Sequence, residues 1–370
     1  MKRFSVVAVL FIFLSAALHS GAAPKDDWNF AVSGDSRNCG DVVVPAIAEG
    51  VKRDHAAFYW HLGDLRAIYG IDEDYLHEPE RRGQPPNKEQ YLKEAWDDFI
   101  QSQIAPFGKT PVFVGIGNHE LVPPKTREDF VAKFKPWLDA PPLRKQRLAD
   151  DAADQQPRTY FHWIQKGVDF ISLDNATINR YDFDAAQLEW FEGVIGRASK
   201  SQEVKAVVLG MHAALPDSVA FGHSMSDFPA GVESGRRVYN DLLKFQQQTG
   251  KHVYILASHS HFFISGLYNT DYWQKNGGVL PGYIVGTAGA IRYPLPAGLF
   301  RATEARQKVY GYLLGTVHSD GTIDFDFQEV KRRDVPAGVV QRFSPEFTQT
   351  CFDKNTDFRP PTTAPAHTEP

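Results

Sequence analysis

TPVFVGIGNHE, residues 110–120, runs from an apolar segment straight into glycine, asparagine, histidine and glutamate. A short apolar run of this kind, rich in Val, Phe and Ile, is typical of a buried β-strand. Asn118 and His119 then belong to the loop that follows the strand. In open α/β sheets, ligands bind beyond the carboxyl ends of the strands, so we expect this loop to lie at a ligand site.

Six other apolar runs end in the same abrupt way, at Gly, Asp, Asn or His. They occupy residues 28–35, 56–64, 168–175, 204–212, 252–261 and 282–290. Helical patterns lie between several of them, at residues 88–104, 185–198 and 234–248. Alternating strands and helices are typical of an α/β fold whose sheets are covered by helices. Nearer the C-terminus, residues 310–330 predict a β-hairpin that turns at Asp320-Gly321.

Polar side chains with metal-binding potential follow five of the predicted strands. They are Asp35, Asp64, Asn118 with His119, His212, and His259 with His261. One such residue is weak evidence, because Asp is a common turn residue and a lone His is more often structural. Together they supply carboxylate, amide and imidazole ligands, a set that suits Zn, Mn or Fe. A shared carboxylate would also suit a pair of metal ions.

The order of these blocks resembles the calcineurin-like metallophosphoesterases, which include the purple acid phosphatases. The blocks are GDSR (34–37), GDLR (63–66), GNHE (117–120), GMH (210–212) and SHSH (258–261), and GNHE is the most specific of them. The resemblance covers residues 30 to 290. It implies an α/β fold in which two β-sheets form a sandwich flanked by helices, four layers in all. The metal site is then expected at the carboxyl ends of the strands.

The resemblance also implies roles for single residues. Asp64 would bridge two metal ions (Mn, Zn or Fe). Asn118, His212 and His259 would complete one site, and Asp35 with His261 would hold the other. His119 would not bind metal but would act as general acid. The implied function is hydrolysis of a small-molecule phosphate mono- or diester through in-line attack by a metal-bound hydroxide.

Two positions depart from the family pattern. Many members have His two residues after the first Asp, where this chain has Arg37. Purple acid phosphatases have Tyr three residues after the second Asp, where this chain has Ala67, with Tyr69 two residues further on. The first metal therefore lacks one ligand. Arg37 and Arg66 are candidates for contact with the substrate phosphate, or for salt bridges to nearby carboxylates such as those in 72–80.

Two other functions remain open. Because the first metal site lacks a ligand, the protein could bind metal or phosphate without catalysing hydrolysis. Ser36 in GDS could instead be the nucleophile of a serine esterase. The sequence lacks the Gly-x-Asn-Asp block and the late Asp-x-x-His that such enzymes use, and a serine esterase would leave His212, His259 and His261 unexplained. We interpret His61 as structural, whereas His223 could reach the site or lie on the surface.

The N-terminus has the pattern of a secretory signal peptide, here residues 1–22. A positive start is followed by an apolar run at 4–18 and by small residues. The apolar run is too short for a stable membrane span, so we expect an exported protein, periplasmic or extracellular. With a net charge of −5 and no basic stripe, nothing indicates a nucleic-acid partner. The oligomeric state stays open.

The remaining sequence suggests a single catalytic domain, residues 28–330. Polar, irregular segments at 66–87 and 121–157 are expected as insertions over one face, 331–358 as a C-terminal extension, and the Pro/Thr-rich end 359–370 as disordered. Cys39 and Cys351 are the only cysteines. In an exported protein they could form a disulfide, or they could be two unrelated buried thiols.

Overall fold

The computed structural model describes residues 27–177, 180–220, 222–297, 299 and 301–353. The predicted signal peptide, residues 1–22, lies outside the described residues. So do the end of the predicted extension and the predicted disordered tail, from residue 354 onward. Among the helices in the described part of the chain, none has both the length and the apolar character needed to cross a membrane.

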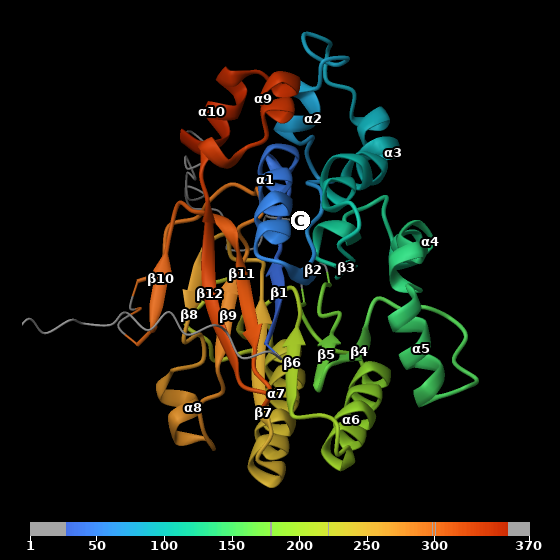
Figure 1. The fold of residues 1–370 in the computed structure, drawn as a ribbon, viewed down its shortest axis with the longest axis vertical. Coiled ribbons are helices and arrows are strands. Elements are labelled where there is room, and N and C mark those ends of the chain that lie inside the picture. The colour runs from blue at the N-terminus through green and yellow to red at the C-terminus, as the bar shows by residue number, and fades with distance from the viewer. Residues whose placement is uncertain (1–26, 178–179, 221, 298, 300, 354–370) are drawn as a thin grey trace, which may run out of the picture.

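Two β-sheets form the centre of the molecule (Figure 1). The five-stranded sheet has the order β12-β11-β1-β2-β3, and the seven-stranded sheet has the order β10-β8-β9-β7-β6-β5-β4. The strands of the first sheet are β1 (Trp28–Ser33), β2 (Ala56–His61), β3 (Val112–Val114), β11 (Tyr310–Val317) and β12 (Ile323–Val330). Those of the second are β4 (Phe161–Gln165), β5 (Val168–Ser172), β6 (Ala206–Gly210), β7 (His252–Ala257), β8 (Phe263–Ser265), β9 (Gly282–Val285) and β10 (Glu304–Arg306).

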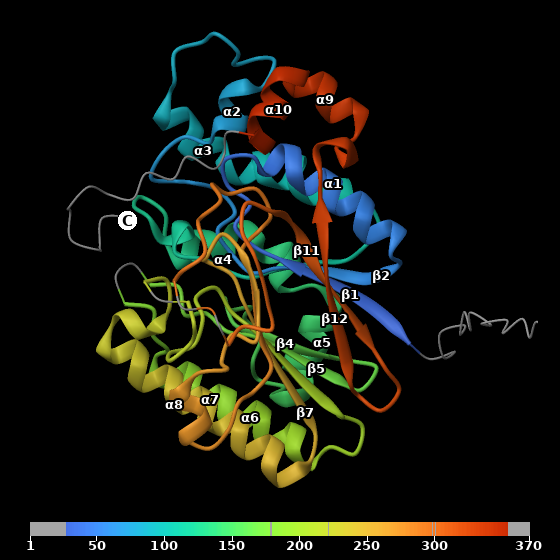
Figure 2. The same ribbon diagram turned by 90° about the vertical axis from the view of Figure 1, so that its left-hand side faces the viewer.

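Helices cover the outer sides of the two sheets, as Figure 2 shows. The five-stranded sheet is covered by α1 (Gly40–Arg53) and α3 (Lys88–Phe99), with α2 (Glu73–His77), α9 (Ala337–Phe343) and α10 (Pro345–Asp353) beyond them. The seven-stranded sheet is covered by α6 (Ala185–Lys200), α7 (Pro229–Thr249) and α8 (Asp271–Lys275). Two further helices, α4 (Arg127–Leu138) and α5 (Pro141–Asp150), lie at one side. This arrangement confirms the predicted two-sheet sandwich flanked by helices.

Aromatic side chains fill the space between the sheets. Phe30 and Phe58 of the first sheet stack with ring centroids 5.5 Å apart. Phe170 of the second sheet meets both of them edge-on, at 5.0 and 5.1 Å. Such ring pairs contribute roughly 0.5–1.5 kcal/mol each beyond their area burial. The alternating apolar residues of β1, β2 and β5 therefore hold the two sheets together.

The strand register brings the loops that carry the motifs to one end of the sandwich. In the first sheet, Ser33 pairs with His61, and His61 pairs with Val114, so three parallel strands end side by side. In the second sheet, Gly210 of β6 pairs with Leu256 of the parallel strand β7. The loops after β1, β2, β3, β6 and β7 are therefore neighbours although they are far apart in sequence.

The predicted strands and helices are all present, with ends that differ by a few residues. The 310–330 hairpin turns at Gly321, whose φ of +92° suits glycine. The two segments with an irregular sequence pattern contain helices, since α2 lies within 66–87 and α4 and α5 lie within 121–157. A capping box explains the start of α4, since Thr126 and Asp129 satisfy each other's backbone N–H groups. The limits of the predicted domain and insertions stay predictions.

Cys39 and Cys351 form a disulfide, with their Cα atoms 5.9 Å apart. The bond joins residues that are 312 positions apart in the chain. Cys39 immediately precedes α1, and Cys351 lies in α10, so the bond fastens the C-terminal helices to the loop after β1. That loop carries Asp35 and Arg37. Of the two alternatives for the cysteines, the disulfide is the one the structure contains.

We expect the double variant Cys39→Ser/Cys351→Ser to unfold more easily than the parent. A native disulfide stabilises mainly by restricting the unfolded chain, and losing one costs about 2–5 kcal/mol. Urea unfolding of both proteins measures the difference. Reducing agent should lower the stability of the parent and leave the double variant unchanged. Equal unfolding free energies for parent and variant would contradict this role.

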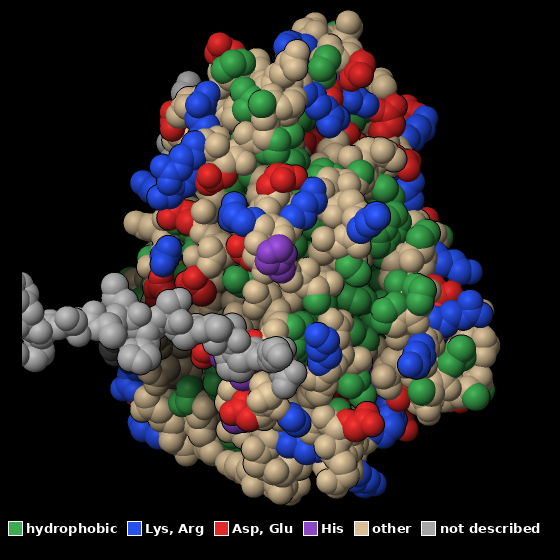
Figure 3. Space-filling view, viewed as in Figure 1, with side chains coloured by type: hydrophobic (Ala, Val, Ile, Leu, Met, Phe, Trp, Pro, Cys, Tyr) green, Lys and Arg blue, Asp and Glu red, His purple; other side chains and the backbone are tan. Residues whose placement is uncertain are grey.

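Charged side chains of both signs are spread over the face seen in Figure 3. Lys and Arg alternate there with Asp and Glu, and the visible apolar groups lie between them. This face therefore carries no single-sign field that would steer one class of charged ligand.

Candidate metal centre

Three of the predicted metal ligands have a left-handed backbone. Asp35, Asp64 and His259 have φ values of +59°, +58° and +65°, a region that non-glycine residues seldom adopt. Each stands in the turn just after its strand, β1, β2 or β7. Residues in strained conformations cluster at functional sites, where the surrounding structure holds them in place. The backbone thus points to these turns as the functional part of the fold.

Glycine next to these residues lets the turns approach one another. A Cβ atom on Gly117 would lie 2.2 Å from Asp64 Oδ1 and 2.4 Å from the Asp64 backbone nitrogen. A Cβ atom on Gly34 would lie 2.1 Å from Ser258 Oγ. The glycines of GDSR and GNHE are therefore needed for space, because they allow the turns from different strands to meet.

We expect Gly117→Ala to lower both metal affinity and stability. The new methyl group would collide with backbone and with Asp64, which cannot rotate away, and such overpacking costs about 1–3 kcal/mol. Metal content after equilibrium dialysis and the thermal unfolding temperature measure the two effects. Gly70→Ala is the matched control, because a Cβ atom there would meet nothing within 4 Å. Equal metal content in the two variants would contradict the packing argument.

Four predicted ligands converge around the side chain of His212. Its Nε2 atom lies 2.9 Å from Asn118 Oδ1, 3.1 Å from His259 Nδ1 and 3.3 Å from Asp64 Oδ1. All four residues are buried. Ligand atoms bound at about 2.0–2.2 Å around one ion lie roughly 3–3.5 Å from one another. The spacing, the burial and the mixed N/O chemistry therefore fit one metal ion held by Asp64, Asn118, His212 and His259.

In three histidines, the Nδ1–H group donates a hydrogen bond to a backbone carbonyl, which fixes the orientation of the ring. The Nδ1–H groups of His212, His261 and His119 donate to Leu62 O (3.1 Å), Ile291 O (2.5 Å) and Ala67 O (2.6 Å), respectively. This leaves each Nε2 atom facing the centre. Metal-binding histidines commonly use their second nitrogen in this way, although His119 is not among the converging ligands.

The electrostatics of the buried groups favour a bound cation. Burial disfavours the charge on Asp64, yet His119 and His212 hold the pKa of this carboxyl well below its usual range. Burial, together with the neighbouring His212, holds the pKa of His259 well below its usual range. Burial opposes the charge on His212 as well, but Asp64 raises its pKa to about 9. An ionised Asp64 and a neutral His259 are the forms that bind metal, and at His212 an ion would displace a proton.

The second predicted set, Asp35 with His261, lies beside the first. Asp35 Oδ1 is 3.2 Å from His261 Nε2, and Asp35 Oδ2 accepts hydrogen bonds from the Ser258 hydroxyl and the His259 N–H group. Asp35 Oδ1 and Asp64 Oδ2 are buried without a hydrogen-bond partner among the described residues. Between the two sets lies Arg37, whose Nη2 atom donates to His261 Nε2 at 3.1 Å.

His119 lies next to the converging ligands and does not belong to them. Its Nε2 atom is 3.5 Å from Asp64 Oδ2. The ring of Tyr69 packs against the ring of His119, with centroids 4.9 Å apart. Tyr69 is 42% exposed, so this side of the centre is close to solvent. His119 itself is fully buried, against the exposed ring of Tyr69.

Sequence reasoning missed several residues that shape the centre. The carboxylate of Glu120 accepts the backbone N–H groups of Asp64, Leu65 and Gly117, all within 2.9 Å. It joins the GDLR turn to the GNHE turn. Its position as the last residue of the GNHE motif was the sequence feature that could have indicated this role. The rings of Tyr181 and His223 lie 4.9 and 5.3 Å from that of His259, and Tyr293 stacks on His261 at 4.0 Å. His223, which the sequence left between the site and the surface, thus lies beside His259 and is partly exposed.

Arg66 lies in a different environment from Arg37. Its side chain has no exposed surface, and its guanidinium pairs with Asp41 at 2.7 Å, with Asp74 at 3.1 Å and with Asp98. Asp72 is 3.7 Å away. A guanidinium enclosed by carboxylates has no side left for a phosphate. The arrangement favours the salt-bridge interpretation of Arg66 over contact with substrate.

Ser36 and His61 do form a hydrogen bond, 2.9 Å long, but its polarity is wrong for a serine nucleophile. His61 Nδ1 accepts the backbone N–H of Gly63 at 3.2 Å, so its proton resides on Nε2 and is donated to Ser36. A catalytic base must instead accept the serine proton. Burial also lowers the pKa of His61 to about 4. Ser36 is itself fully buried, which agrees with a structural role for the pair.

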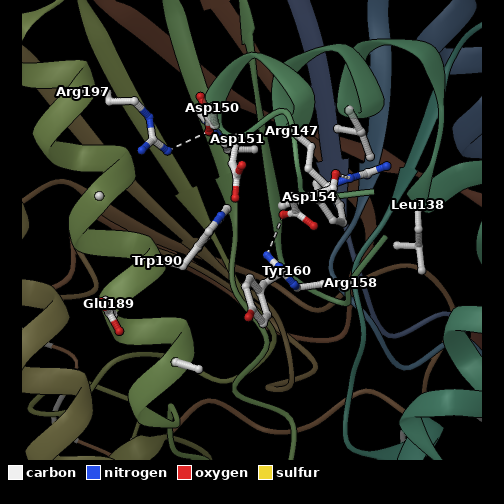
Figure 4. A pocket seen from close by; sticks show the side chains of 15 residues that line it. Leu138, Arg147, Asp150, Asp151, Asp154, Arg158, Tyr160, Glu189, Trp190 and Arg197 are labelled. Atoms are coloured by element: carbon white, nitrogen blue, oxygen red, sulfur yellow. Dashed lines mark hydrogen bonds and ion pairs between the residues drawn. The ribbon is translucent and has the colours of Figure 1, made fainter. Parts of the chain in front are cut away.

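The pocket in Figure 4 is a separate cavity of about 670 Å³ between α5, α6 and β4. Several of its charged side chains pair with one another. Arg197 contacts Asp150 at 2.7 Å, and Arg158 contacts Asp154 at 2.9 Å. Asp150 also contacts His162 at 2.5 Å. None of the predicted site residues lines this pocket.

No protein-family model and no curated protein sequence matches the chain. Solved structures are similar to it, among them the following two. The purple acid phosphatase PPD1 from yellow lupin seeds (Lupinus luteus) aligns with a TM-score of 0.53 and 15% identity over 82% of this chain. PhoD aligns with a TM-score of 0.52 and 14% identity over 89% of this chain and 77% of its own. This chain spans about half of the lupin protein, 51%. At these identities the likeness establishes the fold alone, and it confirms the metallophosphoesterase fold that the motifs implied.

Proposed function

We propose that this protein is a metal-dependent phosphoesterase, exported from the cell, that hydrolyses a small-molecule phosphate mono- or diester. The observation that carries the proposal is the convergence of Asp64, Asn118, His212 and His259 on one point, from four separate strand ends. The likeness in fold to a purple acid phosphatase supports it. When bound, a metal ion polarises a phosphoryl oxygen and activates water.

The protein's own residues hold and orient the reacting groups. The four ligands hold the ion, and the carbonyl of Leu62 keeps the ring of His212 in the orientation that binding needs. Glu120 keeps the turns around Asp64 and Gly117 in register. This preorganisation matters because a small misplacement of reacting groups lowers the rate strongly.

His119 is proposed as the general acid. Its Nδ1–H group is fixed on the carbonyl of Ala67, so Nε2 is the atom that carries a proton toward the centre. From there it would protonate the leaving oxygen of the ester. General acids of this kind contribute about 10²–10⁴-fold to the rate.

Export is supported by the Cys39–Cys351 disulfide, because such bonds persist in oxidising compartments. The pattern of residues 1–22 agrees with it. Mass spectrometry of the protein secreted by its host should find an N-terminus close to residue 23 and both cysteines oxidised. An intracellular protein with free thiols would overturn this part of the proposal.

A second function is favoured by one observation. Arg37 donates to His261, the ligand expected at the first metal position, which would suit a protein that binds metal or phosphate without turnover. The two functions differ in a single-turnover assay. Excess protein loaded with Mn, Zn or Fe releases product if it is an enzyme and only retains the phosphoester if it is a binding protein.

The proposal is tested by elemental analysis of the purified protein, followed by a panel of phosphoesters assayed with Mn, Zn and Fe. We expect one metal to support hydrolysis of at least one ester and a chelator to abolish it. Absence of bound metal, together with no hydrolysis under any metal, would overturn the proposal.

A further inference from the structure

The guanidinium of Arg37 lies among the residues that were expected to hold a first metal ion. Its Nη2 atom is 3.1 Å from His261 Nε2, and its Nε atom is 3.9 Å from Asp64 Oδ2. The Arg37 side chain is only 3% exposed. Tyr69 covers it from outside, with its hydroxyl 3.3 Å from Nη1. The positive charge is therefore buried next to two candidate ligands, not directed to solvent.

The contact with His261 uses the lone pair that a metal would need. His261 donates its Nδ1–H to the carbonyl of Ile291, so Nε2 is its acceptor atom. That atom accepts a hydrogen bond from Arg37. One imidazole nitrogen cannot direct the same lone pair at a guanidinium and at an ion.

Asp35 has only one oxygen available as a metal ligand in place of His261. Its Oδ2 atom already accepts from the Ser258 hydroxyl and from the His259 backbone N–H. Only Oδ1 remains, and it faces His261 at 3.2 Å. For the first metal ion this leaves two carboxylate oxygens, Asp35 Oδ1 and Asp64 Oδ2. The positively charged Arg37 guanidinium already lies beside them.

We propose that the centre takes a single metal ion, bound by Asp64, Asn118, His212 and His259, and that the Arg37 guanidinium replaces the other ion as a built-in positive charge. This inference rests on the proposed function, since it specifies the metal content of the same centre. A second ion beside Arg37 would place two cations at close range in a buried site, where repulsion is strong. The guanidinium, 3.9 Å from Asp64 Oδ2, supplies positive charge to a carboxylate that the second ion would otherwise neutralise.

The test is the number of Mn(II) ions bound per chain after dialysis, with the EPR spectrum of the same samples. The wild-type protein should bind one Mn(II) per chain and show the spectrum of an isolated ion. Arg37→His should restore the missing ligand, bind two ions and show the spectrum of an exchange-coupled pair. Arg53→His is the matched control, because Arg53 is largely exposed, and it should still bind one ion.

The outcomes separate this inference from the proposed function. Two coupled ions in the wild-type protein would overturn the inference and leave a phosphoesterase standing. A folded Arg37→His protein that still binds one ion would overturn the role given to Arg37. No bound Mn(II) in any of the proteins, together with no phosphoester hydrolysis, would overturn the metal centre itself. The wild-type result does not depend on whether a variant folds.

Discussion

His212→Ala should abolish metal binding and lower kcat/KM for phosphoester hydrolysis by about 10³-fold or more. His212 Nε2 is the atom on which the other three ligands converge, within 2.9–3.3 Å. Removing the imidazole of His212 leaves the buried carboxylate of Asp64 without one of its positively charged or metal-holding neighbours. Loss of an outer-shell partner alone costs roughly 10–100-fold in metal affinity or activity, and a direct ligand should cost more.

The measurement is metal content by elemental analysis alongside steady-state rates. His162→Ala is the matched control, because His162 is also a buried histidine that pairs with two carboxylates, Asp150 and Asp169, away from the centre. It should lose stability and keep its metal. A His212→Ala protein with full metal content would contradict the ligand assignment.

His119→Asn should lower kcat by about 10²–10⁴-fold while the metal content stays that of the wild-type protein. Asn can still donate a hydrogen bond but cannot transfer a proton at neutral pH. His119 itself is not among the converging ligands, so the variant separates proton transfer from metal binding.

The leaving group gives a sharper readout of the same variant. Esters of acidic phenols need little protonation as they leave, so His119→Asn should hydrolyse them almost as fast as the wild-type protein does. Alkyl esters should show the full loss. An equal loss for both kinds of ester would contradict a general-acid role and favour a role in binding the phosphate.

Much of the fold and the grouping of the candidate ligands could be predicted because both depend on local sequence. Each candidate ligand follows an apolar run that forms a strand, and parallel strands end at the same edge. The order of Asp64, Asn118, His212 and His259 therefore predicted a cluster. The same reasoning missed α1, because its run of Val42, Val43 and Val44 with Pro45 has the composition of a strand or a break.

The contacts that could not be predicted join residues distant in the chain. Arg37 and Arg66 both follow GD by two positions, yet one faces His261 and the other is enclosed by Asp41, Asp74 and Asp98. No local pattern distinguishes them, because the partners come from other loops and helices. The hydrogen bond between Ser36 and His61 could not be predicted either, because the two residues come from different segments of the chain.

The central claim is that phosphoester hydrolysis depends on metal at this centre. Chelator-treated protein should be titrated with Mn(II) while bound metal and hydrolysis rate are measured in the same samples. We predict that the rate rises in proportion to occupancy and levels off when each chain holds one ion. Full hydrolysis by metal-free protein, or a rate unrelated to occupancy, would contradict the account.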